Sequence, residues 1–287
     1  MSYTIIIHDG KAHMDELLGS ALLALHLGEV PEKIERLNTQ EAADLVSSGT
    51  IPENTYLIDC GLVFDSEKKL FDHHQDRELD SAALLVFNKF FSYLENTNLH
   101  DYIKLVSRVD TKGAMSLDDF HLISESRDYF TFGQKVLLST FEKDPMQILK
   151  IFIEGLDDKI SFEILKQKAS KWLEESGNIE IITIEHIKVI KYLTEPPSEL
   201  VSPMRSAISK IVDDNNITAI LSFDDKQPGV LTLYRTDYGH STIDFSKSNP
   251  TETIFKHQGG FLMKFIPSDE NEWLKLIKES LFINIQT

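Results

Sequence analysis

The chain has one cysteine, Cys60, and no long apolar run among its 287 residues. A single thiol cannot form an internal disulfide, and such a composition is typical of proteins from reducing compartments. A helix that crosses a bilayer needs about 20 mainly apolar residues, and no stretch of this sequence approaches that length. The opening segment MSYTIIIH lacks the features of a secretory signal and is typical of a strand. We therefore expect a soluble, cytoplasmic protein.

Basic residues are also scarce, because 29 Lys and Arg stand against 46 Asp and Glu and leave a net charge of −17. Proteins that grip long nucleic acids usually carry a basic face that neutralises phosphates. The acidic balance has two compatible interpretations, namely ordinary solubility, or a site where divalent cations supply the positive charge that phosphates need. Together they favour short or small phosphate substrates over processive binding of duplexes.

The first part of the chain alternates strand-like and helix-like segments. Short β-branched or apolar runs predict strands, and apolar residues at helical spacing predict helices. The predicted strands are 4–7, 33–37 and 56–58, and the predicted helices are 15–27, 40–47, 81–94 and 99–109. This alternation predicts an α/β fold, with a parallel sheet covered by helices on both faces. Ligands bind such sheets at the carboxyl ends of the strands, where His8 and Asp59 lie.

The length of the chain favours two domains. We expect a first domain at 1–150, a helical connector at 151–184 and a smaller α/β domain at 185–287. The clearest helices of the middle part are 146–152 and 160–175, and this part could serve a dimer interface or a hinge. The last part predicts strands at 179–184, 187–192, 218–223, 230–234 and 261–265, and helices at 203–212 and 273–281.

Histidine and acidic residues recur in four segments of the first 113 residues. The most informative is FDHHQ at 71–75, because adjacent histidines after an aspartate are hard to explain as core packing. The others are HDGKAHMDE at 8–16, LIDCG at 57–61 and RVDTKG at 108–113. Mixed imidazole and carboxylate ligands suit divalent first-row metals such as Mn²⁺, and two such ions can cleave a phosphoester. The candidate ligands are His8, His13, Asp15, Asp59, His73 and Asp110, with Asp59 a natural bridge.

Each candidate also has an ordinary structural interpretation. His8 can be a satisfied polar residue at a strand end, and His13 and Asp15 can cap the following helix. Asp59 and Asp110 can be turn residues. The joint occurrence of these residues in this order favours a metal site over these interpretations taken one by one.

These motifs resemble the DHH phosphoesterase superfamily, through Asp72-His73-His74 and the three accompanying segments. HDGKAHMDE, YLIDCG at 56–61, VFD at 63–65 and FDHHQ are most similar to the MYG1 (UPF0160-type) branch. The resemblance is strong over residues 1 to about 115 and weaker beyond. It implies a DHH-type catalytic domain followed by a substrate-binding C-terminal domain.

The resemblance also implies roles for single residues. His8, His13 and Asp59 would hold one ion, and Asp15, Asp59, His73 and Asp110 would hold the other. His74 would contact the substrate phosphate or support a ligand, and Asp72 would orient a histidine ring. Most superfamily members carry an aspartate where this chain has His13, which is typical of the MYG1-like branch. The implied cofactors are two divalent ions, foremost Mn²⁺, with Mg²⁺ and Co²⁺ as alternatives.

The second half offers one motif, HQGGF at 257–261. Paired glycines let backbone amides approach an anion, although a plain loop before a strand explains them as well. The resemblance implies a glycine-rich, histidine-bearing loop that holds substrate phosphate, and it assigns His257, Gly259 and Gly260 to that loop. Arg235 could pair with a phosphate. Arg205 and His240 are weaker candidates, and for all three residues an ordinary salt bridge or surface role is equally expected.

The resemblance implies metal-dependent phosphodiester hydrolysis, with 3′→5′ exonuclease action on RNA or short oligonucleotides as the leading activity. Pyrophosphate, polyphosphate and cyclic dinucleotides are alternative substrates, since superfamily relatives hydrolyse each of them. A metal-binding regulator without turnover is an alternative from another class. A homodimer is a further possibility, and no membrane partner is expected.

Overall fold

The computed structural model describes residues 2–113 and 124–282. Contacts between Cα atoms divide the chain into two compact units, Met1–Glu163 and Ile164–Thr287. The division falls inside the long helix α6 (Pro145–Glu174). The expected domain limits at 150 and 184 stay predictions, and part of the first of these segments lies outside the described residues.

The first unit is built on a five-stranded sheet with the order β2-β1-β3-β5-β4. Its strands are β1 (Thr4–His8), β2 (Lys33–Leu37), β3 (Thr55–Ile58), β4 (Phe64–Asp65) and β5 (Leu70–Phe71). β2, β1, β3 and β5 are parallel to their neighbours, whereas β4 pairs with β5 in the antiparallel direction. The prediction of a parallel sheet is therefore corrected at one edge, where the short β4 and β5 escaped the sequence pattern because each has two residues.

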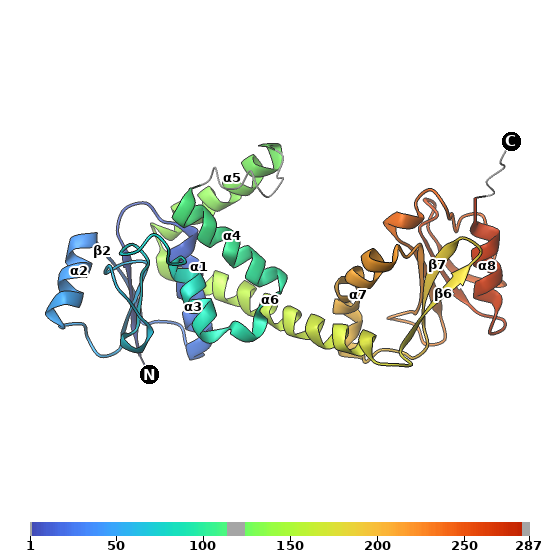
Figure 1. The fold of residues 1–287 in the computed structure, drawn as a ribbon, viewed down its shortest axis with the longest axis horizontal. Helices are drawn as coiled ribbons and strands as arrows, with labels where there is room; N and C mark the ends of the chain where they lie inside the picture. The colour runs from blue at the N-terminus through green and yellow to red at the C-terminus, as the bar shows by residue number, and fades with distance from the viewer. Residues whose placement is uncertain (1, 114–123, 283–287) are drawn as a thin grey trace. The chain divides into compact units, whose positions relative to one another are not determined.

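Helices cover both faces of this sheet (Figure 1). On one face α2 (Thr39–Ser48) packs Ala42, Leu45 and Val46 against buried strand residues such as Leu57. On the other face lie α1 (Met14–Leu27) and α3 (Ala82–Phe90), which contact each other. The run of buried residues in α1 reflects this double contact with sheet and helix. The predicted covering of both faces is thus observed.

The helices after the sheet differ from the prediction in two places. The helix expected at 81–94 ends at Phe90 and is followed by a separate 3₁₀ turn, Ser92–Leu94. The helix expected to end at 109 continues as α4 (Asn98–Lys112), so Asp110 lies in a helix and not in a turn. The two segments 146–152 and 160–175 belong to the single helix α6, which follows α5 (Ser124–Phe141). In the described part of the chain, no helix combines the length and apolar character that crossing a membrane requires.

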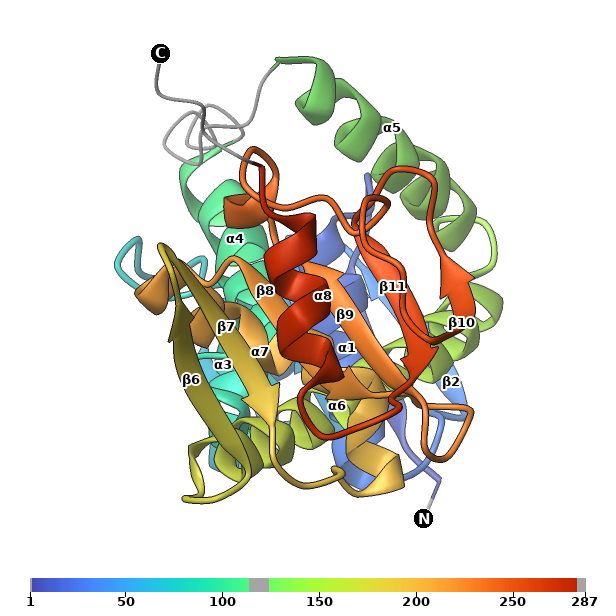
Figure 2. The same cartoon turned by 90° about the vertical axis from the view of Figure 1, so that its right-hand side faces the viewer.

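The second unit contains a six-stranded mixed sheet with the order β10-β11-β9-β8-β7-β6. Its elements are β6 (Ile179–Ile184), β7 (Ile187–Tyr192), α7 (Val201–Asn215), β8 (Ala219–Phe223), β9 (Leu231–Arg235), β10 (Glu252–Lys256), β11 (Leu262–Ile266) and α8 (Glu272–Ser280). One core cluster joins α7 and the end of α6 to β7 and β8, and another joins α8 to β7, β8, β9 and β11. Figure 2 shows α8 crossing its face of this sheet. The edge strand β10 was not predicted.

Glu272 illustrates how α8 is anchored. Its side chain accepts hydrogen bonds from the backbone amides of Thr251, at 2.6 Å, and Ser268, at 2.5 Å. Burial alone would raise the pKa of this carboxyl, but these hydrogen bonds outweigh burial and lower the pKa to about 2. The first turn of α8 is thereby joined to the chain that enters and leaves the β10–β11 pair.

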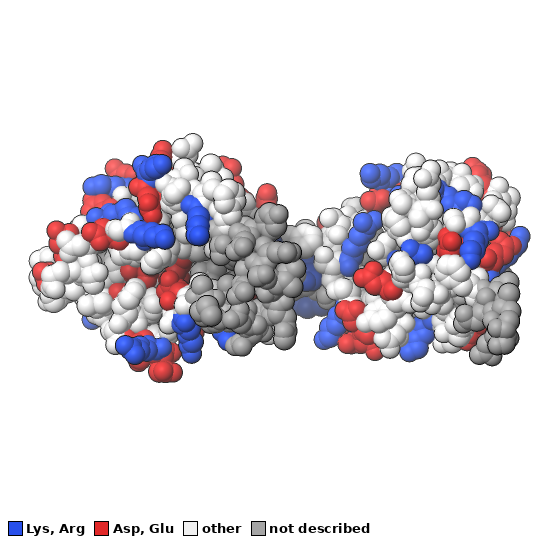
Figure 3. Space-filling view, turned by 90° about the horizontal axis from the view of Figure 1, so that it is seen from above, with Lys and Arg blue, Asp and Glu red and all other residues white. Residues whose placement is uncertain are grey.

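Charged side chains of both signs are interspersed over the face seen in Figure 3. The net charge of −17 is therefore not segregated as one acidic face there.

Candidate metal centre

Three neighbouring parallel strands deliver the site residues to the same edge of the first sheet. His8 is the last residue of β1, Asp59 follows β3, and Asp72 follows β5. The register of the pairs β1–β3 and β3–β5 places these ends together. Parallel strands present their carboxyl ends at one edge of a sheet, where α/β proteins bind ligands. The predicted position of His8 and Asp59 is therefore observed.

The backbone directly after β3 has a left-handed conformation, which sets the direction of the Asp59 side chain. Asp59, Gly61 and Leu62 have φ angles of 57°, 101° and 58°. A Cβ atom on Gly61 would lie 2.9 Å from Leu57 Cδ2 and 3.0 Å from Val46 Cγ2, so this position, with its positive φ angle, favours glycine. Left-handed backbone at residues other than glycine costs free energy and is concentrated at functional sites.

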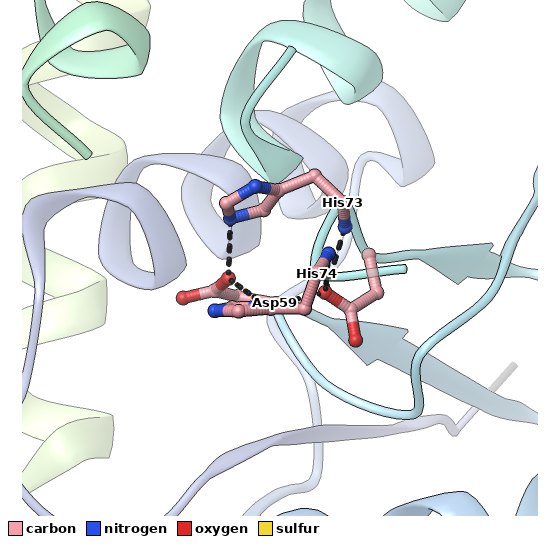
Figure 4. Close-up of side chains that lie close together, drawn as sticks. Asp59, His73 and His74 are labelled. Carbon is pink, nitrogen blue, oxygen red and sulfur yellow. Dashed lines mark hydrogen bonds and ion pairs between the residues drawn. The ribbon is translucent and has the colours of Figure 1, made fainter. Parts of the chain in front are cut away.

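The Asp59 carboxylate is the centre of the cluster. Its oxygens lie 3.5 Å from Nε2 of His8, 3.3 Å from Nε2 of His73 and 3.7 Å from Nδ1 of His74. Figure 4 shows His73 and His74 around Asp59. The side chain is 1% exposed, yet neither oxygen makes a hydrogen bond within the described residues, and the same holds for Nε2 of His8 and of His73. Buried polar atoms are normally satisfied by hydrogen bonds, whereas these converging atoms contact one another only as ion pairs, an arrangement that suits a shared cation.

Asp110 joins this cluster from the last turn of α4. Its carboxylate lies 3.0 Å from Nε2 of His73 and 3.8 Å from Nδ1 of His13. Burial by itself lowers the pKa of His73, but Asp110 and Asp59 outweigh burial and raise it to about 10. His13 occupies the N-cap position of α1 without capping the helix through its side chain, so its ring is available to the cluster. The alternative of His13 as a helix cap is therefore wrong.

Asp15 performs a structural task that its sequence position does not suggest. Its carboxylate accepts hydrogen bonds from the backbone amides of Ala82, at 2.8 Å, and Ala83, at 2.9 Å, and from the hydroxyl of Ser81. It thus caps the amino end of α3, and not the helix on which it lies. Burial, and then the charges of Asp59 and Asp110, raise the pKa of Asp15 well above its usual value. Three carboxylates held this close repel one another unless one keeps a proton or a cation lies between them.

Glu16 and Arg36 were missed by the sequence analysis. Glu16 is fully buried, and its carboxylate lies 2.5 Å from Nε2 of His8 and 3.3 Å from Nη1 of Arg36. Burial lowers the pKa of His8, but Glu16 and then Asp59 outweigh burial and raise it to about 9. The signal in the sequence was the acidic pair Asp15-Glu16, of which only the first residue was selected.

Asp72 and His74 form a second layer beside the cluster. Asp72 is fully buried and accepts hydrogen bonds from the amides of Leu62, at 2.6 Å, and His73, at 2.7 Å, and lies 2.7 Å from Nδ1 of His74. Burial would raise the pKa of Asp72, but the hydrogen bonds from His74 and Leu62 outweigh it and lower the pKa. Asp72 in turn raises the pKa of His74. Since Nδ1 of His74 faces Asp72, its Nε2 atom is left for a ligand.

A cavity of about 140 Å³ opens onto this cluster. It is lined by His8, His13, Thr39, Asp59, Cys60, Leu62, Asp72 and His74. Cys60 is not suited to metal binding, because burial, and then the charges of Asp72 and Asp59, raise its pKa far above the usual range, and its thiol donates to the carbonyl of Ile6.

The donor atoms fit one or more divalent cations. Three groups of residues bring their donor atoms within 4.8 Å of one another: His8, His13 and Asp59; Asp15, Asp59, His73 and Asp110; and Asp59, Asp72, His73 and His74. Asp59 belongs to all three. Imidazole nitrogens and carboxylate oxygens without thiolates suit ions such as Mn²⁺. Each of the six predicted ligand residues thus belongs to at least one of these groups, and Asp59 connects the groups.

The residues of the second unit that were expected to bind phosphate make hydrogen bonds inside that unit. Arg235 donates from Nη1 to the carbonyl of Ile243, at 3.0 Å, and from Nη2 to that of Gly259, at 3.5 Å, so it supports the glycine loop. The amide of Gly259 donates to Nδ1 of His257, and that of Gly260 donates to its carbonyl, each at 2.9 Å. These two amides, expected to face an anion, are therefore used inside the loop. Arg205 and His240 are exposed.

Gly260 is required by its surroundings, because its φ is 64° and an added Cβ atom would overlap Oδ1 of Asp244. The loop therefore presents His257 in one arrangement, with its ring 4.0 Å from that of Phe261 between centroids. Because Nδ1 accepts a hydrogen bond, Nε2 of His257 carries the proton and is the donor that the loop can offer.

Comparison with known proteins gives one result for the first unit. No curated protein matches the chain. Residues 4–93 match the family model MYG1_exonuc, described as an uncharacterised protein family (UPF0160). The matched segment contains β1 to α3, and therefore includes five of the six candidate ligands: His8, His13, Asp15, Asp59 and His73. The match supports the similarity to the MYG1-like family over this part of the chain.

Proposed function

We propose that this chain is a metal-dependent phosphodiester hydrolase of the DHH type, which acts as a 3′→5′ exonuclease on RNA or short oligonucleotides. The observation that carries the proposal is the buried Asp59 carboxylate, approached by three histidines, with neither oxygen in a hydrogen bond to a described residue. The family name MYG1_exonuc points in the same direction.

The residues divide between two ion positions. His8, His13 and Asp59 would hold one ion, and Asp15, Asp59, His73 and Asp110 would hold the other, with Asp59 shared. Mn²⁺ suits this donor set, and Mg²⁺ and Co²⁺ are alternatives. When bound, such ions lower the pKa of water and supply positive charge at a phosphoester.

The protein's own contribution is to orient and to donate. Asp72, held by backbone amides, fixes the His74 ring through Nδ1 and raises its pKa. His74 is half exposed and lines the cavity. A protonated His74 would donate from Nε2 to a phosphoryl oxygen and stabilise the negative charge that develops there. The carbonyl of Asp9, 2.5 Å from Nδ1 of His8, would hold that ring with Nε2 facing the cluster, and Glu16 would add a carboxylate beside the same Nε2.

In the second unit, we propose the Nε2–H group of His257 as the contact to substrate phosphate. Arg235, Gly259 and Gly260 would keep the loop in the required shape, because their hydrogen-bonding groups are engaged within it. This assigns the loop residues a positioning role around one donor.

The test is Mn²⁺-dependent hydrolysis of three substrates, a labelled 20-nucleotide RNA, a dinucleotide and pyrophosphate. Stepwise shortening of the RNA from its 3′ end is the expected result, and His73→Ala should lower the rate by about a hundredfold or more. His186→Ala is the matched control, because His186 is an exposed histidine of the second unit.

The other outcomes separate the alternatives. Cleavage of the dinucleotide alone would restrict the activity to short oligomers. Phosphate release from pyrophosphate alone would contradict the diesterase and indicate a phosphoanhydride hydrolase. Metal binding without turnover of any substrate would favour a regulatory protein.

A further inference from the structure

A second concave surface of the first unit lies between α3 and α4, away from the cavity lined by the histidines. It is an open groove of about 500 Å³. Its lining residues come from the start and body of α3 and from one face of α4: Asp80, Leu84, Asn88, His100, Lys104, Ser107, Arg108, Thr111 and Lys112. The function proposed above uses none of these side chains.

The α4 side of this groove carries a row of cations. Lys104, Arg108 and Lys112 are spaced by four residues, so they share one face of the helix, and the row spans about 12 Å at 1.5 Å per residue. Lys104 and Lys112 are exposed, and neither forms an ion pair with an acidic residue of the described chain. Asp80 is the one acid among the described lining residues. The positive charges of Lys104 and Lys112 in this groove contrast with the net charge of −17.

The floor of the groove is apolar and rigid. The His100 ring stacks on Phe87 with 4.9 Å between centroids, and its Nδ1 atom accepts the amide hydrogen of Asn96 at 3.2 Å. Burial, and then the charge of Lys104, lower the pKa of His100, so it adds no charge. Leu84 from α3 is also buried. A cationic wall beside an apolar floor matches a chain that has phosphates on one side and sugars or bases on the other.

The groove is connected to the metal centre through the first residues of α3. The Ser81 amide donates to Oγ of Ser107, at 2.9 Å, in the groove wall. The Ser81 hydroxyl donates to Asp15, a candidate metal ligand. The exposed segment 75–80 runs directly from His74 to Asp80 and carries Arg77. Ser81 at the amino end of α3 therefore links the groove wall to the metal centre, and the segment 75–80 offers a bound strand a path between them.

We propose that the α3–α4 groove binds the phosphate backbone of a single-stranded RNA substrate, beyond the nucleotide that is being cleaved. The inference rests on the proposed exonuclease function, and it adds that substrate length is sensed by Lys104 and Lys112. Each phosphate contact releases bound counterions, so affinity for long strands should depend on salt. A dinucleotide is too short to reach the groove, so its hydrolysis should not depend on Lys104 and Lys112.

The experiment compares the full-length wild type with the double variant Lys104→Gln/Lys112→Gln. The control is Lys143→Gln/Lys150→Gln, which removes two exposed lysines from the same unit. Turnover in Mn²⁺ is measured on the 20-nucleotide RNA and on the dinucleotide. Binding of fluorescein-labelled RNA is measured as a function of salt, with each pair placed in the His73→Ala background to prevent cleavage.

We expect the groove variant to raise KM for the 20-nucleotide RNA by about tenfold, with kcat and all dinucleotide kinetics unchanged. The slope of log K against log salt should become shallower by about 1.4, since each phosphate contact contributes about 0.7 for single strands. The control should match the wild type. An unchanged KM and an unchanged salt slope in the groove variant, or no RNA binding by the parent protein, would overturn the proposal.

The two proposals fail separately. If no substrate is cleaved but the groove variant has a shallower slope of log K against log salt, the exonuclease function is refuted and RNA binding in the groove is supported. If the groove variant shortens RNA as well as the wild type and has the same salt slope of RNA binding, RNA binding in the groove is refuted and the exonuclease function is supported.

Discussion

The change Asp59→Asn tests the metal centre most directly. Asp59 belongs to every group of candidate ligands, and its oxygens approach three histidines at 3.3–3.7 Å. Asparagine keeps the shape of the side chain and tolerates the left-handed backbone at φ 57°. The variant therefore removes one charge and one ligand oxygen while the fold of the loop is retained.

The magnitude follows from linkage between binding and folding. At a Mn²⁺ concentration about a hundred times Kd, binding stabilises the folded state by about 2.7 kcal/mol. For a unit the size of Met1–Glu163, this raises the melting temperature by about 5–10 °C. The wild type should show this rise, and Asp59→Asn should lose nearly all of it because no group keeps its full ligand set.

The measurement is thermal denaturation with Mn²⁺ and with EDTA, together with calorimetric titration of Mn²⁺. Asp44→Asn is the matched control, because Asp44 is an exposed aspartate on α2 of the same unit, and it should keep the full rise. A complete Mn²⁺-induced rise in Asp59→Asn would refute the assignment of Asp59 as the shared ligand.

Three further predictions follow from the same structure. Metal binding needs neutral imidazoles, but the neighbouring carboxylates raise the pKa of His8 to about 9 and that of His73 to about 10 in the metal-free protein. The affinity for Mn²⁺ should therefore increase from pH 6 to pH 8, and binding should release protons. Calorimetry in two buffers of different ionisation enthalpy measures this proton release. Gly61→Ala should lower the free energy of unfolding by about 1–3 kcal/mol, more than Gly49→Ala, where no atom lies within 4 Å of the added Cβ; urea titrations that rank the two equally would contradict this. The pKa of Glu272 is lowered to about 2, so its ionised carboxylate stabilises the second unit at pH values above the pKa of this group in the unfolded chain. This stabilisation is lost as the pH falls towards 2, and acid titration followed by circular dichroism should show a weaker pH dependence in Glu272→Gln.

Local patterns in the sequence determined much of the fold. The periodicity of apolar residues placed β1, β2, β3, α1 and α2 within a few residues of their observed limits, because a helix or strand that packs on one side leaves that period in the chain. The same reasoning placed His8 and Asp59 at strand ends. It did not find β4, β5 or β10, and it did not find the break after α3, because two-residue strands and an exposed edge strand leave too little pattern to detect.

The sequence also pointed to the chemistry of the site, since adjacent histidines after Asp72 and repeated acids favoured metal ligands. The spatial roles were decided by tertiary structure. Asp15 caps a helix that begins 67 residues later along the chain, Glu16 contacts His8, and Asp110 reaches the cluster from the last turn of α4. Such contacts depend on how distant segments pack, and no local spacing encodes them.

The same division holds for the two basic features. The spacing of Lys104, Arg108 and Lys112 was present in the sequence, but only the packing of α3 against α4 makes a groove beside it. Arg235 was a candidate for pairing with a phosphate, but the fold directs its guanidinium to backbone carbonyls. The sequence by itself determined which residues are candidates for binding metal and phosphate. The tertiary structure decided which of them remain candidates, because hydrogen bonds to distant segments engage some donors, such as the Arg235 guanidinium, whereas others, such as the atoms around Asp59, converge on one another.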